Sequence, residues 1–279
     1  MTLPRPTFRE HLGLVRMMGD IGHQTDEIHR RWGPIVDVGY ATTLRVVYAF
    51  GVDVNRELLV DRPEDFRWGE VMAGLTPCVG ETALVVSDGD DHDRRRRLVQ
   101  PAFSRRRVDA NAALIVEEID RMLDGWAPGT TVDAHDHGRR AVRRIAVRTL
   151  FGHRLGDVAD RIGDALEPAL SFVNRPPGFR LEVDLGVNHY HRCRRGRRAA
   201  DAIIQAEIDR RRRDGTPTDD PDILTALMDE SAGDRLSDAE LRDQVISMIA
   251  AGYDTTSSAL AWLTYGLGTH PGIQDELRD

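Results

Sequence analysis

The sequence predicts a mainly α-helical fold with one small β-sheet. From about residue 89 onward, apolar side chains recur three or four positions apart, which is the spacing of amphipathic helices. β-branched residues gather in two short runs between residues 35 and 49, which is typical of strands. The breaks between helical segments are short and rich in glycine and proline, so we expect a single domain over residues 1–279.

The amino-terminal part is predicted to be one helix followed by a hairpin. Apolar residues at helical spacing over 7–32 end at the helix-breaking pair Gly33-Pro34. The two β-rich runs of 35–49 are separated by four residues, which favours a hairpin of two short strands. A short helix is expected next, over 52–60.

The remainder of the chain is predicted to be almost wholly helical. The exception is its first part, the segment 66–82, whose glycines and proline predict a long irregular connection. Connections of that length tend to be functional. Helices are then expected at about 89–100, 105–125, 137–151, 157–174, 187–213, 221–231 and 238–268, with a last one that begins at Pro271.

The helix predicted at 238–268 has a clearly marked start. Ser237 and Glu240 stand three residues apart as in a capping box, and Leu236 and Leu241 are placed as its hydrophobic staple. Apolar residues flank the middle of this helix on nearly every face. We therefore expect it to be a buried central helix.

Three polar residues interrupt that apolar helix, in the segment 251–256 with the sequence Ala-Gly-Tyr-Asp-Thr-Thr. An unpaired polar group in a core costs about 1–3 kcal/mol, so Asp254 and Thr255 point to chemistry. The Thr255 hydroxyl can bond back to the carbonyl of Ala251 or point into a cavity. Gly252 indicates close approach of a bulky group. The alternative is an ordinary helix crossing at Ala251 and Gly252.

A second group of candidate residues lies in the charged segment 89–104. On a helix, His92 and Arg96 are four residues apart and share a face, so both side chains could reach one anionic group. The alternative is a solvated charge run, in which Arg94–Arg97 pair with the neighbouring aspartates.

Composition excludes several function classes. The 38 basic residues, all of them arginine, and the 46 acidic ones give a formal charge of −8, which argues against a general polyanion binder. Two cysteines are too few for a disulfide framework, and His135 and His137 lack a third metal ligand and are interpreted as part of a solvated loop. With no signal peptide or membrane-spanning segment evident, we expect a cytoplasmic protein that binds neither membrane nor nucleic acid.

Together the two candidate segments resemble the haem-thiolate monooxygenases called cytochromes P-450. The segment 251–256 is similar to the family's oxygen-activation motif, and His92 with Arg96, followed by Pro-Ala-Phe-Ser at 101–104, resembles its haem-propionate helix. The segments 61–66 and 269–271 also resemble family landmarks, in the right order. The resemblance is to a soluble bacterial type of the family.

The resemblance implies a site as well as a fold. It implies haem b in the complete enzyme, with His92 and Arg96 at the propionates and with Ala251 and Gly252 allowing the ring and dioxygen to approach the helix. Asp254 and Thr255 would relay protons to bound oxygen. The implied partners are O2, a small hydrophobic organic substrate and a ferredoxin with its reductase, or a similar redox partner.

The family's cysteine ligand is missing from the place where the resemblance requires it. Neither Cys78 nor Cys193 stands in a Phe-x-x-Gly-x-x-x-Cys segment after the long helix. We therefore expect the chain to be the amino-terminal two-thirds or so of such an enzyme, poorly soluble and inactive alone. The alternative is a non-enzymatic, all-helical binding protein that uses its arginine clusters, listed by range: 94–97, 105–107, 194–198 and 210–213.

Overall fold

The computed structural model describes residues 3–16, 20–39, 46–152, 156–175, 180–215, 222–229 and 234–278. The chain divides into two compact units, Met1–Arg67 and Trp68–Asp279. The expectation of one domain over the whole chain stays a prediction.

The first unit contains helices and a two-stranded antiparallel sheet, in which Val36 lies opposite Tyr48. Its small core consists of the buried side chains of Leu14, Ile28, Val36 and Val38. The sheet forms within the predicted hairpin, of which residues 40–45 lie outside the described ranges. The elements are α1 (Phe8–Arg16), α2 (Ile21–Trp32), β1 (Ile35–Asp37), β2 (Val47–Ala49) and α3 (Val52–Arg56), which a π-helical turn, Glu57–Asp61, and a 3-10 turn, Pro63–Asp65, continue.

The single helix predicted over 7–32 is wrong, because the structure has two helices there. Asp20 has a non-helical backbone, with φ −134° and ψ 85°, and its carboxylate accepts a hydrogen bond from the backbone N–H of His23 at 3.0 Å. This is the geometry of an N-cap, so a new helix starts at Ile21. Residues 17–19 lie outside the described ranges.

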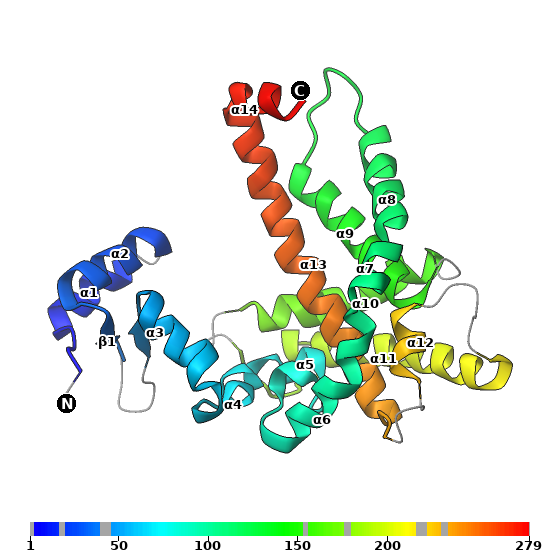
Figure 1. The fold of residues 1–279 in the computed structure, drawn as a ribbon, viewed down its shortest axis with the longest axis horizontal. Helices are drawn as coiled ribbons and strands as arrows, with labels where there is room; N and C mark the ends of the chain where they lie inside the picture. The colour runs from blue at the N-terminus through cyan, green and yellow to red at the C-terminus, as the bar shows by residue number, and fades with distance from the viewer. Residues whose placement is uncertain are drawn as a thin grey trace. The chain divides into compact units, whose positions relative to one another are not determined.

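The second unit is built around the long helix α13 (Asp238–Thr269), which runs through it (Figure 1). The last helix, α14 (Pro271–Arg278), follows the end of α13 that extends past α10 and α11. The capping box expected at Ser237 and Glu240 is present. At 32 residues, α13 is roughly 48 Å long at 1.5 Å per residue. The other helices are α4 (Trp68–Met72), α5 (Thr76–Val79), α6 (Gly89–Val99), α7 (Arg105–Ala110), α8 (Ala112–Asp124), α9 (Ala134–Phe151), α10 (Gly156–Val173), α11 (His189–Asp214) and α12 (Ile223–Leu227), with 3-10 turns at Ala73–Leu75, Leu84–Val86 and Gln100–Phe103.

The irregular connection predicted over 66–82 is also wrong, since α4 and α5 form within it. The Asp88 carboxylate accepts hydrogen bonds from the backbone N–H groups of Gly69, at 2.9 Å, and Glu70, at 3.2 Å, and so satisfies the first turn of α4. Pro77 lies in the first turn of α5, where a proline is tolerated, and Gly80, with φ 91°, ends that helix.

Three other predicted helices have different bounds. The segment 105–125 is divided at Asn111, whose φ of −87° and ψ of −2° separate α7 from α8. The predicted helix 137–151 begins earlier, at Ala134, because the Asp133 carboxylate accepts a hydrogen bond from the Asp136 N–H at 3.0 Å. His135 and His137 thus lie in a helix, not in a loop. The prediction over 221–231 is reduced to the short α12.

The core of the second unit lies around the first half of α13. Buried apolar residues of α5, α9, α10, α11 and α12 pack there against Leu241, Val245, Ile246 and Ile249. Beyond Ser257, by contrast, the described residues of α13 are half-buried or exposed, and Trp262 is 73% exposed. The prediction that this helix is buried throughout is therefore wrong for its second half, which extends past α10 and α11 (Figure 1).

A glycine allows the close crossing of α10 and α11. A Cβ atom at Gly196 would lie 2.2 Å from the backbone carbonyl oxygen of Ala165, which cannot move away as a flexible side chain could. We expect Gly196→Ala to destabilise the protein by about 1–3 kcal/mol. The matched control is Gly266→Ala in α13, where nothing lies within 4 Å, and it should stabilise by about 0.5–1 kcal/mol. Thermal unfolding followed by circular dichroism should show shifts of opposite sign, and shifts of the same sign would refute the close crossing.

Candidate active site

The predicted polar segment lies in the middle of α13 and faces open space on one side. Ala251 and Thr255 are exposed, and Gly252 is half-buried. A Cβ atom added at Gly252 would meet no heavy atom within 4 Å. The alternative of a tight helix crossing at Ala251 and Gly252 is therefore wrong as far as the described residues go.

Thr255 bonds back to its own helix. Its hydroxyl donates a hydrogen bond to the Ala251 carbonyl at 2.6 Å, which is one of the two arrangements expected from the sequence. The buried position expected for Asp254 and Thr255 is wrong, since Asp254 is half-buried and Thr255 exposed. The elements that pack on α13 cover instead the side that carries Tyr253 and Ser257, which are both buried.

Asp254 accepts a hydrogen bond from the residue that follows α10. The Asn174 side-chain amide, just after the last residue of that helix, donates a hydrogen bond to Oδ2 of Asp254 at 3.1 Å. The two residues are 80 positions apart in the sequence, so the pairing depends on how α10 crosses α13. This contact fixes one carboxylate oxygen and leaves the other without a hydrogen bond from the described residues.

Tyr253, beside Asp254, joins three helices. Its hydroxyl donates to Oε2 of Glu167 on α10 at 2.9 Å and accepts from Nε of Arg139 on α9 at 2.7 Å. The Arg139 guanidinium lies 5.2 Å from the centre of the tyrosine ring and pairs with Glu167. Burial, together with the Glu167 carboxylate, raises the pKa of Tyr253 above its ordinary value, so the phenol stays neutral. This group was not predictable from the sequence, in which its only signal was an aromatic residue inside the polar segment.

A polar hollow of about 410 Å³ opens where these three helices meet. Two arginines and two carboxylates contribute to it, together with a histidine, a serine, an asparagine and one leucine. Its lining residues are His135, Arg139, Glu167, Leu170, Ser171, Asn174, Arg175 and Asp254.

The predicted pair on α6 faces outward. His92 and Arg96 are four residues apart on that helix, half-buried and exposed respectively, and Nδ1 of His92 lies 3.0 Å from the Asp93 carboxylate. Within the ranges that the structure describes, Arg96 has no ion-pair partner. No hydrogen bond or ion pair between described residues joins this pair to the segment 251–256.

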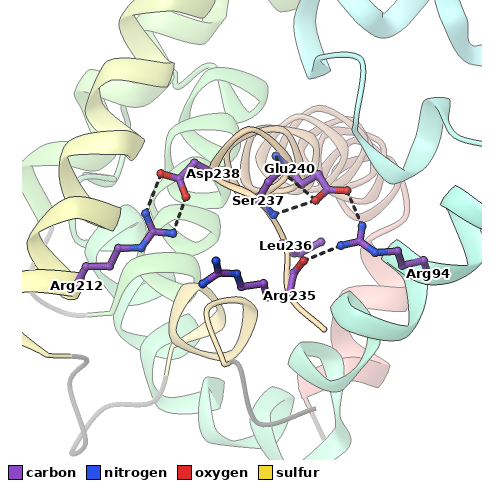
Figure 2. Close-up of a pocket in the computed structure, with 7 residues that line it drawn as sticks. All are labelled: Arg94, Arg212, Arg235, Leu236, Ser237, Asp238 and Glu240. Atoms are coloured by element: carbon purple, nitrogen blue, oxygen red, sulfur yellow. Dashed lines mark hydrogen bonds and ion pairs between the residues drawn. The ribbon is translucent and has the colours of Figure 1, made fainter. Parts of the chain in front are cut away.

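The neighbouring arginines of α6 instead clamp the start of α13. Nη1 of Arg94 and Nε of Arg95 donate to the same oxygen of Glu240, at 2.7 and 3.0 Å, while the Ser237 N–H donates to the other oxygen at 2.9 Å. Figure 2 shows Arg94 and Glu240 on one side of the helix start and the Arg212–Asp238 pair on the other. We call Arg94, Arg95, Ser237 and Glu240 the α13 clamp. It fixes the helix that carries His92 and Arg96 against α13.

The α13 clamp strongly lowers the pKa of the Glu240 carboxyl group. Burial alone would raise the pKa of Glu240, but hydrogen bonds from the Ser237 backbone N–H, from Arg95, from the Ser237 hydroxyl and from Arg94 outweigh it and lower that pKa to about 2. The sequence predicted the capping box but not the arginines, which precede Glu240 by about 145 residues.

Several arginines of the predicted clusters bind carboxylates within the chain. Arg94 and Arg95 bind Glu240, Arg197 binds Asp201 and Asp243, and Arg211 binds Glu207 and Asp222. Guanidinium groups paired in this way do not form an open polyanion surface. Nothing in the described structure favours the alternative of a non-enzymatic binding protein.

The two cysteines are buried and unreactive. Cys78 and Cys193 are both 0% exposed, and the Cys193 thiol donates to the Pro77 carbonyl at 3.5 Å. Burial raises the pKa of Cys78 to about 12 and that of Cys193 to about 11, so both remain thiols at neutral pH. Among the described residues there is no group of three or more histidine, cysteine or acidic side chains that could hold a metal ion.

Fold and site together define a class of helical proteins in which one long helix carries an acid and an alcohol at its middle, beside a face of small residues that the described part of the chain leaves uncovered. The chain belongs to the cytochrome P450 family, since the family model described as Cytochrome P450 matches residues 2–279. The cofactor of this family is haem.

Curated relatives include proteins of Mycobacterium tuberculosis and of Streptomyces melanosporofaciens. Cytochrome P450 139 of Mycobacterium tuberculosis (strain ATCC 25618 / H37Rv) is 39% identical over 246 residues, which are 87% of this chain and 56% of that protein. Cyclooctat-9-en-7-ol 5-monooxygenase of Streptomyces melanosporofaciens is 30% identical over 257 residues, which cover 87% of this chain and 53% of the relative. The chain spans about half the length of the curated relatives it matches.

Solved structures show the same fold. The cytochrome P450DA heme domain superposes with a TM-score of 0.80 at 20% identity, over 98% of this chain and 62% of that one. The likeness to solved structures confirms the predicted mainly α-helical fold with a small sheet. In the described part of the chain, no helix combines the length and apolar character that a membrane span requires.

Proposed function

We propose that the chain is the oxygen-activating part of a haem-dependent monooxygenase, which inserts one oxygen atom of O2 into a small hydrophobic organic substrate. The observation that supports this most is the uncovered face of α13, where small residues, Ala251 and Gly252, and the Thr255 hydroxyl lie beside the half-buried Asp254. Such a face fits a flat ring, because nothing within 4 Å of Gly252 competes for the space. Haem, when bound, supplies the iron at which dioxygen is activated.

The side chains of this segment are suited to handling protons. The Asp254 carboxylate can take up and release a proton, and the Thr255 hydroxyl, which donates its own hydrogen to the Ala251 carbonyl, keeps lone pairs that can accept a hydrogen bond. His92 and Arg96 would bind the haem propionates as charge-assisted donors, since both side chains are unburied and lie on one face of α6.

In our proposal the thiolate that binds the haem iron would come from a segment outside this sequence, because Cys78 and Cys193 are buried thiols of raised pKa. The complete enzyme would take electrons from a ferredoxin with its reductase, or a similar redox partner, and would work in the cytoplasm. Neither nucleic acid nor membrane has a place in the proposed reaction.

Haem titration of the purified chain tests this proposal. We expect bound haem whose reduced, CO-treated spectrum lacks the long-wavelength Soret band of cysteinate ligation. The variants His92→Ala and Arg96→Ala should each weaken haem binding by about tenfold, the equivalent of one charge-assisted hydrogen bond. The matched control is Arg97→Ala, an exposed neighbour on α6, which should bind haem as the wild type does.

Two outcomes would each refute one part of the proposal, namely the source of the thiolate and the role of α6. A cysteinate Soret band from this chain alone would mean that Cys78 or Cys193 becomes a ligand despite its burial. If the wild type, His92→Ala and Arg96→Ala bind haem with equal affinity, the two side chains of α6 do not bind the haem propionates.

A further inference from the structure

Two arginines near the junction of α10 and α11 face the same imidazole ring. Arg175 follows the end of α10, and its Nη2 atom lies 2.8 Å from Nε2 and 3.1 Å from Nδ1 of His189, the first residue of α11. Nη2 of Arg192, on the first turn of α11, lies 2.5 Å from the same Nδ1. The two guanidinium groups therefore approach each other across one histidine ring.

This cluster has more hydrogen-bond donors than acceptors. A neutral imidazole offers one lone pair, whereas each guanidinium carries five N–H donors. Partial loss of contact with water, followed by the charges of Arg175 and Arg192, lowers the pKa of His189 below its ordinary value, so the ring is neutral at neutral pH. Nε of Arg175 is buried and has no hydrogen-bond partner. One lone pair cannot satisfy both guanidinium groups.

No carboxylate balances the positive charge of the cluster within the described ranges, where neither Arg175 nor Arg192 forms an ion pair with an acidic side chain. The nearby Asp184 carboxylate is already bound to Nδ1 of His191 at 2.8 Å and to Nη1 of Arg194 at 3.1 Å. The N-terminus of α11, a helix of 26 residues, adds a partial positive charge at the same place. The cluster thus lacks both hydrogen-bond acceptors and negative charge.

An oxyanion with two negative charges supplies what the cluster lacks. The fork of N–H groups on a guanidinium matches the oxygens of a phosphate group, and helix N-termini favour the same ligand. Arg175 also lines the polar hollow described above, whose volume of about 410 Å³ is typical of small-molecule sites. The hollow therefore has room for the remainder of a small polar molecule that carries such an anion.

We propose that Arg175, His189 and Arg192 form a binding site for a phosphate dianion, either free or as the phosphate group of a small polar molecule. The two guanidinium groups donate hydrogen bonds to the phosphate oxygens, and the neutral ring of His189 separates the two cations. The site goes beyond the proposed function, because neither haem nor dioxygen takes part in it.

Phosphate binding to the whole chain without haem tests this site. Phosphorus NMR of inorganic phosphate, titrated with protein at an ionic strength held constant with sodium chloride, gives the affinity. Arg175→Met and Arg192→Met should each weaken binding about tenfold, the equivalent of one charge-assisted hydrogen bond. The matched control is Arg195→Met, which removes the same charge from an exposed position three residues further along α11 and should change the affinity by less than about twofold.

A second variant of Arg192 separates the shape of the guanidinium from its charge. Arg192→Lys keeps the charge but loses the fork of donors, so its affinity should lie between those of the wild type and Arg192→Met. Arg192 is exposed, so its two variants carry the test if Arg175→Met loses helix content in circular dichroism.

Glycerol phosphate identifies the source of the anion. Tighter binding of this ester than of inorganic phosphate would support a phosphorylated molecule whose remainder lies in the hollow. Equal binding of the two would support free phosphate as the ligand.

Other outcomes would overturn the site. Equal affinity in the wild type, Arg175→Met and Arg192→Met would show that the cluster binds no phosphate. A loss in Arg195→Met as large as in Arg192→Met would mean that phosphate responds only to the general positive charge of α11. Failure of the chain to bind haem in the titration above would contradict the proposed function and would leave the phosphate result as it is.

Discussion

Arg211→Met is expected to destabilise the second unit by about 3–5 kcal/mol, because it leaves the buried Asp222 carboxylate without its cation and leaves Glu207 with Arg210 alone. Arg211 is 2% exposed. Its Nη1 and Nη2 atoms donate to the two oxygens of Asp222 at 2.6 and 2.7 Å, its Nε donates to Glu207 at 2.6 Å, and Nη2 also donates to the Phe151 carbonyl at 3.1 Å. One guanidinium thus joins the ends of three helices.

The burial of the partners makes this loss large. The side chains of Glu207 and Asp222 are 7% and 3% exposed, so water cannot replace the guanidinium fully. Hydrogen bonds from Arg210 and Arg211 outweigh burial and lower the pKa of Glu207. Without Arg211, the Asp222 carboxylate is buried without a cation in the folded state, and this cost favours unfolding.

Urea unfolding followed by circular dichroism measures the effect. Arg213→Met is the matched control, since that arginine is exposed near the end of the same helix and should change stability by less than about 0.5 kcal/mol. Arg211→Lys should fall between the two, because an ammonium cannot reproduce the paired bonds to Asp222. A loss in Arg211→Met as small as in the control would show that the ion network contributes no net stability.

Much of the fold was predictable because its signals are local. The capping box at Ser237 and Glu240 fixes the start of α13 by contacts within four residues, and the structure has it. The pair Gly33-Pro34 likewise ends α2 at Trp32. The break at Asp20 was missed because apolar spacing continues on both sides of it, and spacing alone does not show whether a polar residue caps a helix or faces solvent.

The candidate site was predictable only in part. Asp254 and Thr255 stood out because polar groups interrupt an apolar helix, whereas Asn174 and Glu167 carry no signal of their own. Each arginine has many possible partners among 46 acidic residues, and the tertiary structure selects one of them across long separations. In the sequence Arg94 is therefore only one member of a charge run, whereas in the fold it donates a hydrogen bond to Glu240.

Glu240→Gln is expected to lower stability by about 3 kcal/mol at neutral pH, because the folded pKa of about 2 lies well below the ordinary value of 4.5. A carboxyl whose pKa is depressed by folding stabilises the folded state fully above its unfolded pKa. That contribution is lost as the pH falls from about 4.5 toward 2, where Glu240 is protonated in both states. Glutamine keeps the size of the side chain but offers Arg94 and Arg95 no charge.

The pH dependence distinguishes this mechanism from a simple loss of packing. Urea unfolding at pH 7 and at pH values down to 2 should show the difference between wild type and Glu240→Gln shrinking as the pH falls through the window from 4.5 to 2. Glu276→Gln is the matched control, since Glu276 is exposed on α14 and its replacement should leave both the stability and its pH dependence unchanged. A deficit of constant size at every pH would mean that the charge of Glu240 is not what stabilises the α13 clamp. Because that clamp fixes α6 to the start of α13, a deficit confined to neutral pH would also predict that Glu240→Gln weakens haem binding through His92 and Arg96 at pH 7 without altering either side chain.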